Sequence, residues 1–225
     1  MVLADDYRFL VAEYAVSRLE QRIRMWGMPW PLNKSKALDI VRDISRRLKR
    51  ARYSFLPASE LVTNEDLKYV STRARELASL IINQNPPKLE LKQRLALAEM
   101  RWALLILAGL PQRFLLGETN YPEYAVDVVG VEVTRVEPLK GFDKLRVTRG
   151  STGNIVFTIV TNIASIKEGE VRAAALLPPA EFHGIISEAM YASDPIDRKY
   201  IGKRVPRKLL HGEVAAQVIR LVNKR

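Results

Sequence analysis

The 225-residue chain contains no cysteine, only two histidines and no apolar run long enough to cross a bilayer. The absence of cysteine excludes disulfide frameworks, thiolate zinc sites and cysteine nucleophiles. The longest strongly apolar run, Ala103 to Leu110, falls far short of the ~20 residues that a transmembrane helix needs. The first residues also lack the basic region that precedes the apolar part of a signal peptide. We therefore expect a cytoplasmic protein that does not enter a membrane.

Sequence patterns of common catalytic sites are missing as well. There is no Gly-x-Ser-x-Gly elbow, no His-Glu-x-x-His helix and no Gly-x-x-x-x-Gly-Lys-Ser/Thr loop. His183 and His211 are the candidates for acid–base catalysis, and neither lies in such a pattern. An active site is then left only to residues that the fold brings together. We expect a protein that is not an enzyme and that uses no cofactor and no metal.

Basic residues are in excess, with 36 Lys and Arg against 25 Asp and Glu and a net charge of +11. Such an excess attracts RNA, DNA or an acidic membrane surface, and charge alone does not choose among them. Helical spacing between residues 42 and 52 places a cationic stripe opposite the apolar residues, formed by Arg42, Arg46, Lys49 and Arg50. A second cluster comprises Arg198, Lys199, Lys203, Arg204, Arg207 and Lys208. We interpret both as surfaces that contact phosphate, and the alternative for each is an ordinary solvated face.

The hydrophobic period changes near Leu116. Before that point apolar residues recur every three or four positions, which predicts four helices over about 7–26, 35–55, 63–81 and 88–108. We expect Ser35 to cap the second helix and Thr63 to open a capping box for the third. Gly109 and Pro111 are expected to end the fourth. The pattern predicts a helical bundle domain at residues 1–116, which carries 20 Lys and Arg against 12 Asp and Glu.

After Pro122 the chain turns to β-branched and aliphatic runs separated by turn residues. The five candidate strands are residues 126–136, 144–148, 155–160, 171–177 and 185–191. Residues 150–154, between the second and third strands, are typical of a hairpin turn. Five short strands suit a small barrel such as the OB-fold, which often binds oligonucleotides. A helical stripe through Val214, Val218 and Leu221 predicts a closing helix. The fold class is therefore α+β with two domains, an all-α bundle at 1–116 and an OB-fold barrel with a C-terminal helix at 117–225.

Several short motifs of the second half occur in a fixed order. They are Val136-Glu137-Pro138, Asp143-Lys144-Leu145, Ile159-Val160-Thr161-Asn162, Gly169 and Ser187-Glu188-Ala189-Met190. On these residues the segment 124–193 resembles the OB-fold tRNA-binding domain of methionyl- and phenylalanyl-tRNA synthetases and of free-standing tRNA-binding proteins. This chain has Leu139-Lys140-Gly141-Phe142 where that family usually has His-Pro-Asn-Ala, and Ala189 where it has glycine. The similarity covers about a third of the chain and says nothing about residues 1–116.

The resemblance implies a protein that binds tRNA in trans through the barrel face and forms a homodimer. Lys144 would contact phosphate, while Ser187 and Met190 would offer a hydroxyl donor and an apolar contact to a nucleotide, and Asn162 is a further candidate. The opposing interpretation is that Lys144 only caps a strand and that Met190 belongs to the core. Two other functions remain open: a protein-interaction role, as in related bacterial secretion chaperones, and docking to an aminoacyl-tRNA synthetase.

Overall fold

The protein, seen in a computed structural model that describes residues 2–83, 85 and 87–223, divides into two compact units. The first unit comprises the chain up to Ala125 together with the residues from Val218 onward, and the second comprises Val126–Gln217. Helices make up the first unit and an antiparallel sheet dominates the second. The predicted α+β class is confirmed, whereas the OB-fold in its narrower sense and the boundary at 116/117 stay predictions.

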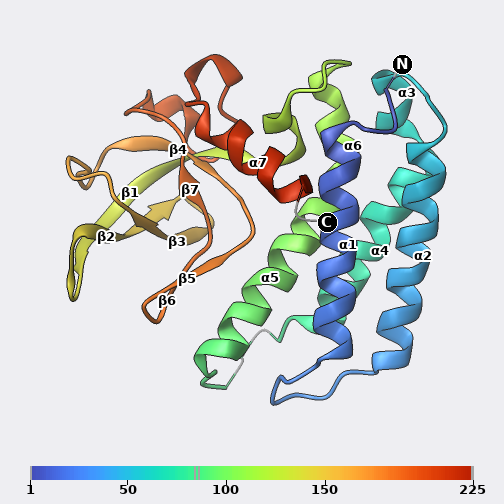
Figure 1. Ribbon diagram of the computed structural model, residues 1–225, viewed down its shortest axis with the longest axis horizontal. Coiled ribbons are helices and arrows are strands. Elements are labelled where there is room, and N and C mark those ends of the chain that lie inside the picture. Colours follow the sequence, from blue (N-terminus) through green and yellow to red (C-terminus); the bar gives the residue numbers. More distant parts are fainter. Residues whose placement is uncertain (1, 84, 86, 224–225) are drawn as a thin grey trace. The chain divides into compact units, whose positions relative to one another are not determined.

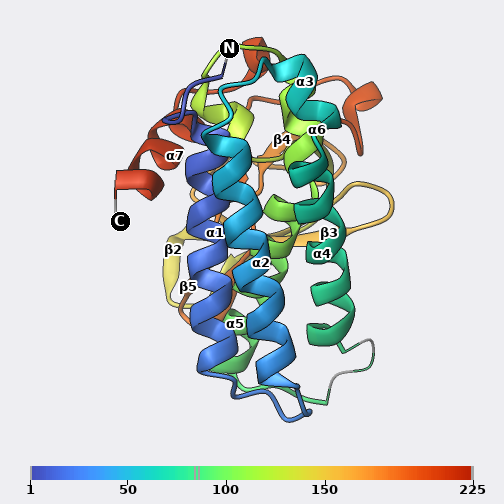
Figure 2. The ribbon, with the colours of Figure 1, turned by 90° about the vertical axis from the view of Figure 1, so that its right-hand side faces the viewer.

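Four long helices run side by side in the first unit, as Figures 1 and 2 show. They are α1 (Tyr7–Arg24), α2 (Lys34–Arg52), α4 (Glu65–Ile81) and α5 (Leu91–Ala108). The short elements are α3 (Ala58–Thr63), α6 (Leu110–Arg113) and the 3-10 helices η1 (Phe114–Leu116) and η2 (Pro122–Ala125). The four predicted helices are confirmed, because each buries one apolar face. The short α3 and α6 were not predicted.

The predicted helix caps are wrong by one or two residues. Asn33, not Ser35, caps α2 by accepting a hydrogen bond from the Lys36 amide at 3.0 Å. Asn64 caps α4 in the same way, while Thr63 ends α3. In both cases an Asx side chain precedes the first helical residue, where its oxygen reaches the free amides of the first turn.

The end of α5 differs in part from the prediction. The helix stops before Gly109 as expected, but Pro111 lies in the first turn of α6. A proline is tolerated there because its missing N–H would have no partner in a first turn. Arg113 then turns back on α5, and its guanidinium donates to the carbonyl oxygen of Ile106 at 2.6 Å. A buried side chain thus satisfies a last-turn carbonyl that the helix leaves free.

Two groups of charged side chains tie the first unit together. Arg8, which is 1% exposed, binds both carboxylate oxygens of Asp6 and donates to the carbonyl oxygens of Arg113 and Gly117. The start of α1 is thereby fixed to the chain that follows α6. In the second group, Glu99 of α5 binds Arg18 and Arg22 of α1. These contacts join helices that are distant in the sequence.

The helices of the described residues differ in length and apolar character. None of their helices is by itself long and apolar enough to cross a bilayer. By length and composition alone, α5 and the following Leu110–Leu116 pass this test as a pair, with a bend of 60° between them.

The second unit is built on a five-stranded antiparallel sheet of order β3-β2-β1-β4-β7. Its strands are β1 (Val128–Leu139), β2 (Phe142–Ser151), β3 (Val156–Thr161), β4 (Val171–Ala175) and β7 (Met190–Tyr191). A separate hairpin consists of β5 (Ala180–Phe182) and β6 (Ile185–Ser187). The first four predicted strands and the turn at 150–154 are confirmed. The fifth was wrong in extent, since residues 185–191 break at Glu188 into β6 and β7, and β5 was not predicted.

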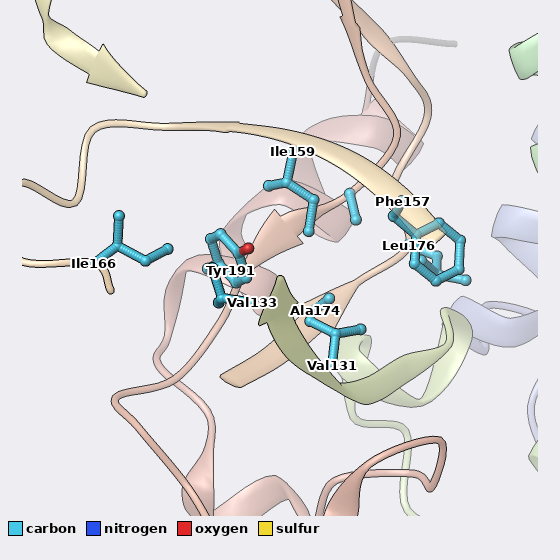
Figure 3. Packing of buried hydrophobic residues seen from close by; sticks show 9 residues of the cluster. Val131, Val133, Phe157, Ile159, Ile166, Ala174, Leu176 and Tyr191 are labelled. Atoms are coloured by element: carbon cyan, nitrogen blue, oxygen red, sulfur yellow. The ribbon is translucent and has the colours of Figure 1, made fainter. Parts of the chain in front are cut away.

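The side chains of this unit's core lie between its strands (Figure 3). This core is formed by Val131, Val133, Phe157, Ile159, Ile166, Ala174, Leu176, Ala189 and Tyr191. Strand β1 is central because its first half pairs with β4 and its second half pairs with β2, and its register against β2 shifts between Val133 and Arg135. Where the pairing of β1 and β2 is regular, successive residues of each strand face the core and the outer surface in turn.

The chain after β7 returns to the first half of β1. It contains the 3-10 helices η3 (Arg198–Tyr200) and η4 (Arg207–Leu209) and then helix α7 (Glu213–Asn223). Backbone hydrogen bonds of 2.9 Å join Gly130 to Gly202 and Lys203, and Val128 to Val205. The predicted closing helix is confirmed as α7, with Val214, Val218 and Leu221 buried.

Candidate nucleic-acid interface

The Ser187-Glu188 pair lies where the last predicted strand breaks. The Ser187 hydroxyl accepts a hydrogen bond from the Val160 amide and donates one to the Ala189 carbonyl, both at 3.0 Å. Glu188 binds Thr158 twice, through its own amide and through its carboxylate. These contacts provide partners for the edge of β3 that faces away from β2. Ser187 is only 6% exposed, so its hydroxyl serves the fold.

Ala189 occupies its position without backbone strain. Among the described residues other than glycine, a positive φ occurs at Phe55 and His183, so Ala189 has an ordinary backbone conformation. Its methyl group belongs to the core cluster. Met190, the next residue, is half-buried in β7 and pairs with Ala175. An alanine in place of the family's glycine is therefore compatible with this fold.

Lys144 and Asn162 are exposed, as an RNA-binding role requires. Lys144 lies on β2, and its ammonium forms no ion pair with any described residue. Asn162 directly follows β3. Of the sheet residues predicted to bind RNA, these two have side chains open to solvent, while Ser187 is buried and Met190 is half-buried.

Two arginines of the outer face were not predicted. Arg135 of β1 lies directly opposite Arg149 of β2, and both are exposed. Arg149 donates to the Thr158 hydroxyl at 3.0 Å, and Arg135 binds Glu137 at 2.6 Å. Like charges on facing positions of two strands destabilise a sheet, and a bound anion would relieve that repulsion. Arg149 lies between Thr148 and Gly150 on β2, and this alternation of small and charged residues in the sequence could have indicated an exposed arginine.

Helix α2 presents its cationic stripe as predicted. Ile44, Leu48 and Ala51 are buried, and Arg42, Arg46, Lys49 and Arg50 are exposed. Carboxylates neutralise part of the stripe, through the pairs Arg42–Asp39, Arg46–Asp43 and Arg50–Asp66 at 2.7, 2.5 and 3.1 Å. The hydrogen bond that Arg47 donates to Asp66 also raises the pKa of Arg47 above its ordinary value. The Arg42–Asp39 and Arg46–Asp43 pairs are exposed and contribute little stability, so an anionic ligand competes easily for these two arginines.

The second basic cluster lies on the chain that runs along β1. Arg198 binds Glu132 at 2.9 Å, and Arg204 lies 3.7 Å from Asp127. The Lys199 amide lowers the pKa of Asp197 by hydrogen bonding to its carboxylate. Lys203 is exposed, and its backbone forms hydrogen bonds with Gly130 and Tyr200. The cluster therefore offers cations on a segment that the sheet fixes in place.

Tyr191 of β7 belongs to the core of the second unit and makes a buried polar contact there. Because the Thr148 hydroxyl donates to the Ile159 carbonyl, the Tyr191 phenol donates to Thr148, at 2.9 Å. Burial raises the pKa of Tyr191 to about 12. The folded protein therefore holds this proton more tightly than the unfolded chain does, and the resulting stability is complete below pH ~10 and lost as the pH rises toward that value of about 12.

Replacing Tyr191 with phenylalanine is expected to lower the free energy of unfolding by about 1 kcal/mol at neutral pH, because one buried hydrogen bond is lost. The variant should also lose less stability than the wild type between neutral and strongly alkaline pH. Urea denaturation followed by circular dichroism at both pH values measures this difference. Tyr53→Phe is the control, since Tyr53 is 57% exposed. An equal alkaline loss in wild type and Tyr191→Phe would contradict the assignment.

The fold and this surface define an α+β protein in which a helical unit accompanies an antiparallel β unit with exposed cations. Residues 3–117 match the family described as an alpha helical domain, and because this match spans half of the chain, the protein belongs to that family. No curated protein matches the chain. Among solved structures, it is similar to a MetRS-related protein from Pyrococcus horikoshii. That similarity has 26% identity and a TM-score of 0.34, and it covers 37% of this chain and 92% of the other.

Proposed function

We propose that this protein binds RNA, with tRNA as its ligand, and that it does so without catalysis. The observation that carries the proposal is the facing pair of exposed arginines, Arg135 and Arg149, on the β1–β2 hairpin. Two guanidinium groups on one rigid sheet bind phosphate well, because they are held close together before the ligand arrives.

Apolar side chains next to these arginines support RNA over other anions. The next outward-facing row of the sheet contains Val147 and Val160, which are opposite each other and half-exposed. Unpaired nucleotides are bound by cations that contact phosphate and by apolar groups that contact bases and sugars. The resemblance of residues 124–193 to tRNA-binding domains adds tRNA as the class of RNA.

The other predicted residues have different roles in this proposal. Lys144 and Asn162 contact RNA directly, and Met190 borders the same region. Ser187 positions β3, because its hydroxyl is already engaged. The remaining cations attract RNA without reading its sequence: Arg42, Arg46, Lys49, Arg50, Lys203 and Arg204. A homodimer and a cytoplasmic location belong to the proposal through the family resemblance.

The test is a titration of the full-length protein with tRNA at several salt concentrations. We expect Lys144→Ala/Arg149→Ala to weaken binding and to reduce the slope of log K against log salt by about 2, since each phosphate contact contributes about 1. Removing the α2 stripe with Arg46→Ala/Lys49→Ala should lower the slope as well. Lys167→Ala is the control, because Lys167 is an exposed cation of the β3–β4 loop. Equal affinity and slope in all variants would contradict the proposal.

A docking role for the helical unit is the second candidate. A hollow of about 490 Å³ lies between α3 and η1, and Ala58, Val62, Phe114 and Leu115 contribute apolar surface to it. Leu115, which lines this hollow, is 69% exposed. Copurification of an aminoacyl-tRNA synthetase with the wild type, but not with Leu115→Ser, would support docking. Recovery of RNA alone would argue against it.

A further inference from the structure

Two aromatic rings stack outside the core of the second unit. Phe142, the first residue of β2, and His183, in the turn between β5 and β6, have ring centroids 3.6 Å apart and an angle of 25° between their planes. Neither ring belongs to the core cluster. His183 is exposed and Phe142 is half-buried, so the stack lies at the surface. The contact joins the tip of the β1–β2 hairpin to the tip of the β5–β6 hairpin.

The backbone at His183 is unusual for a histidine. Its φ is +48°, and Gly184 follows with a φ of +86°. Because Phe182 pairs with Ile185, these two residues form a two-residue hairpin turn, in which asparagine or glycine is favoured at the first position. The Glu181 carboxylate accepts a hydrogen bond from the Gly184 amide and fixes the turn. A histidine is thus held in a strained conformation that places its ring over Phe142.

Cations flank the stack on the β1–β2 hairpin. Lys140 lies in the turn before Phe142, and Lys144 lies two residues after it. Lys144 is exposed and lies among residues 143–145, which have no partner on β1 because the register shifts between the pairs Pro138–Arg146 and Leu139–Phe142. A flat aromatic surface next to an ammonium group matches the two parts of a nucleotide, because bases stack on aromatic rings and phosphates bind cations.

We propose that Phe142 and His183 form a platform on which one unpaired base of the bound RNA stacks, while Lys144 binds a phosphate of the same segment. This inference rests on the proposed RNA-binding function and names the part of the RNA that is recognised. It also gives a role to Phe142, which replaces the alanine usual in the tRNA-binding domain family. The platform distinguishes unpaired from paired nucleotides, because a base within a helix has both faces covered.

The test uses the full-length protein and a short single-stranded RNA with one 2-aminopurine, a base whose fluorescence is quenched by stacking. We expect binding to quench the wild-type signal. Phe142→Leu and His183→Asn should each weaken binding roughly tenfold and remove the quenching, in line with the contribution of one stacked base. Asparagine is chosen because it tolerates a positive φ and keeps the hairpin folded. Phe182→Leu is the matched control, since Phe182 is an exposed ring beside His183 that takes no part in the stack.

The salt dependence separates this inference from the proposed function. Loss of affinity in Phe142→Leu with an unchanged salt slope supports a stacking contact. Wild-type affinity and quenching in both Phe142→Leu and His183→Asn, with salt-dependent binding intact, would overturn the platform and leave RNA binding standing. Failure of the wild type to bind any RNA at low salt would overturn both.

Discussion

Replacing Arg8 with alanine is expected to lower the free energy of unfolding of the helical unit by about 3–5 kcal/mol. The side chain is 1% exposed and its guanidinium lies 4.4 Å from the centre of the Phe114 ring. Without it, the buried carboxylate of Asp6 loses its counterion, and the carbonyl oxygens of Arg113 and Gly117 lose a donor. The Asp6 carboxylate keeps a hydrogen bond from the backbone amide of residue 8, but a buried charge without its counterion is the costly case.

Tryptophan fluorescence during urea denaturation measures the free energy of unfolding of the helical unit. All three tryptophans, Trp26, Trp30 and Trp102, belong to the helical unit. Arg24→Ala is the control, because the Arg24–Glu20 pair is exposed and should contribute less than about 1 kcal/mol. The double variant Asp6→Ala/Arg8→Ala should cost little more than Arg8→Ala. A loss in Arg8→Ala as small as that in the control would show that the buried pair does not stabilise the fold.

Gly130→Ala is expected to destabilise the β unit by about 3 kcal/mol. A Cβ atom at this position would lie 2.2 Å from the carbonyl oxygen of Tyr200, so one of the two backbones has to move. That movement strains the hydrogen bonds that join Gly130 to Gly202 and Lys203. Clashes with backbone are costly because no rotamer change relieves them.

Amide hydrogen exchange reads out this effect locally. The amides of Gly130, Gly202 and Lys203 should lose protection in Gly130→Ala, and the tryptophan-detected unfolding of the helical unit should stay unchanged. Gly27→Ala is the control, since its added Cβ would lie 3.8 Å from the Met25 carbonyl oxygen, which is an ordinary van der Waals distance. If the Gly202 amide stays protected from exchange in Gly130→Ala, the second basic cluster is held in place by other contacts.

The sequence predicted those features that repeat along the chain. The three- to four-residue period located the long helices and the buried face of α2, and therefore the exposed stripe from Arg42 to Arg50. The ion pairs Arg42–Asp39 and Arg46–Asp43 were also readable, because side chains three residues apart meet on a helix. The ion pair between Arg50 and Asp66 could not be predicted in this way, because it joins two different helices.

Features that depend on distant partners escaped prediction. The last strand breaks at Glu188 because Ser187 and Glu188 bind β3, and no local pattern encodes that contact. Strand β5 is exposed along its whole length and so has no alternation to detect. The position of Arg149 opposite Arg135 follows from the register of β1 against β2, which the sequence does not reveal. The fold was therefore easier to predict than the candidate site.

Two carboxylates of the helical unit are each shared by two arginines. Glu99 binds Arg18 and Arg22, and Asp66 binds Arg47 and Arg50. The hydration of charged groups becomes less favourable on warming, so the cost of removing water from such clusters falls as the temperature rises. Their contribution to stability therefore grows with heat, while that of the apolar core levels off. We therefore expect these two clusters to raise the melting temperature of the helical unit above the value that apolar packing alone would give.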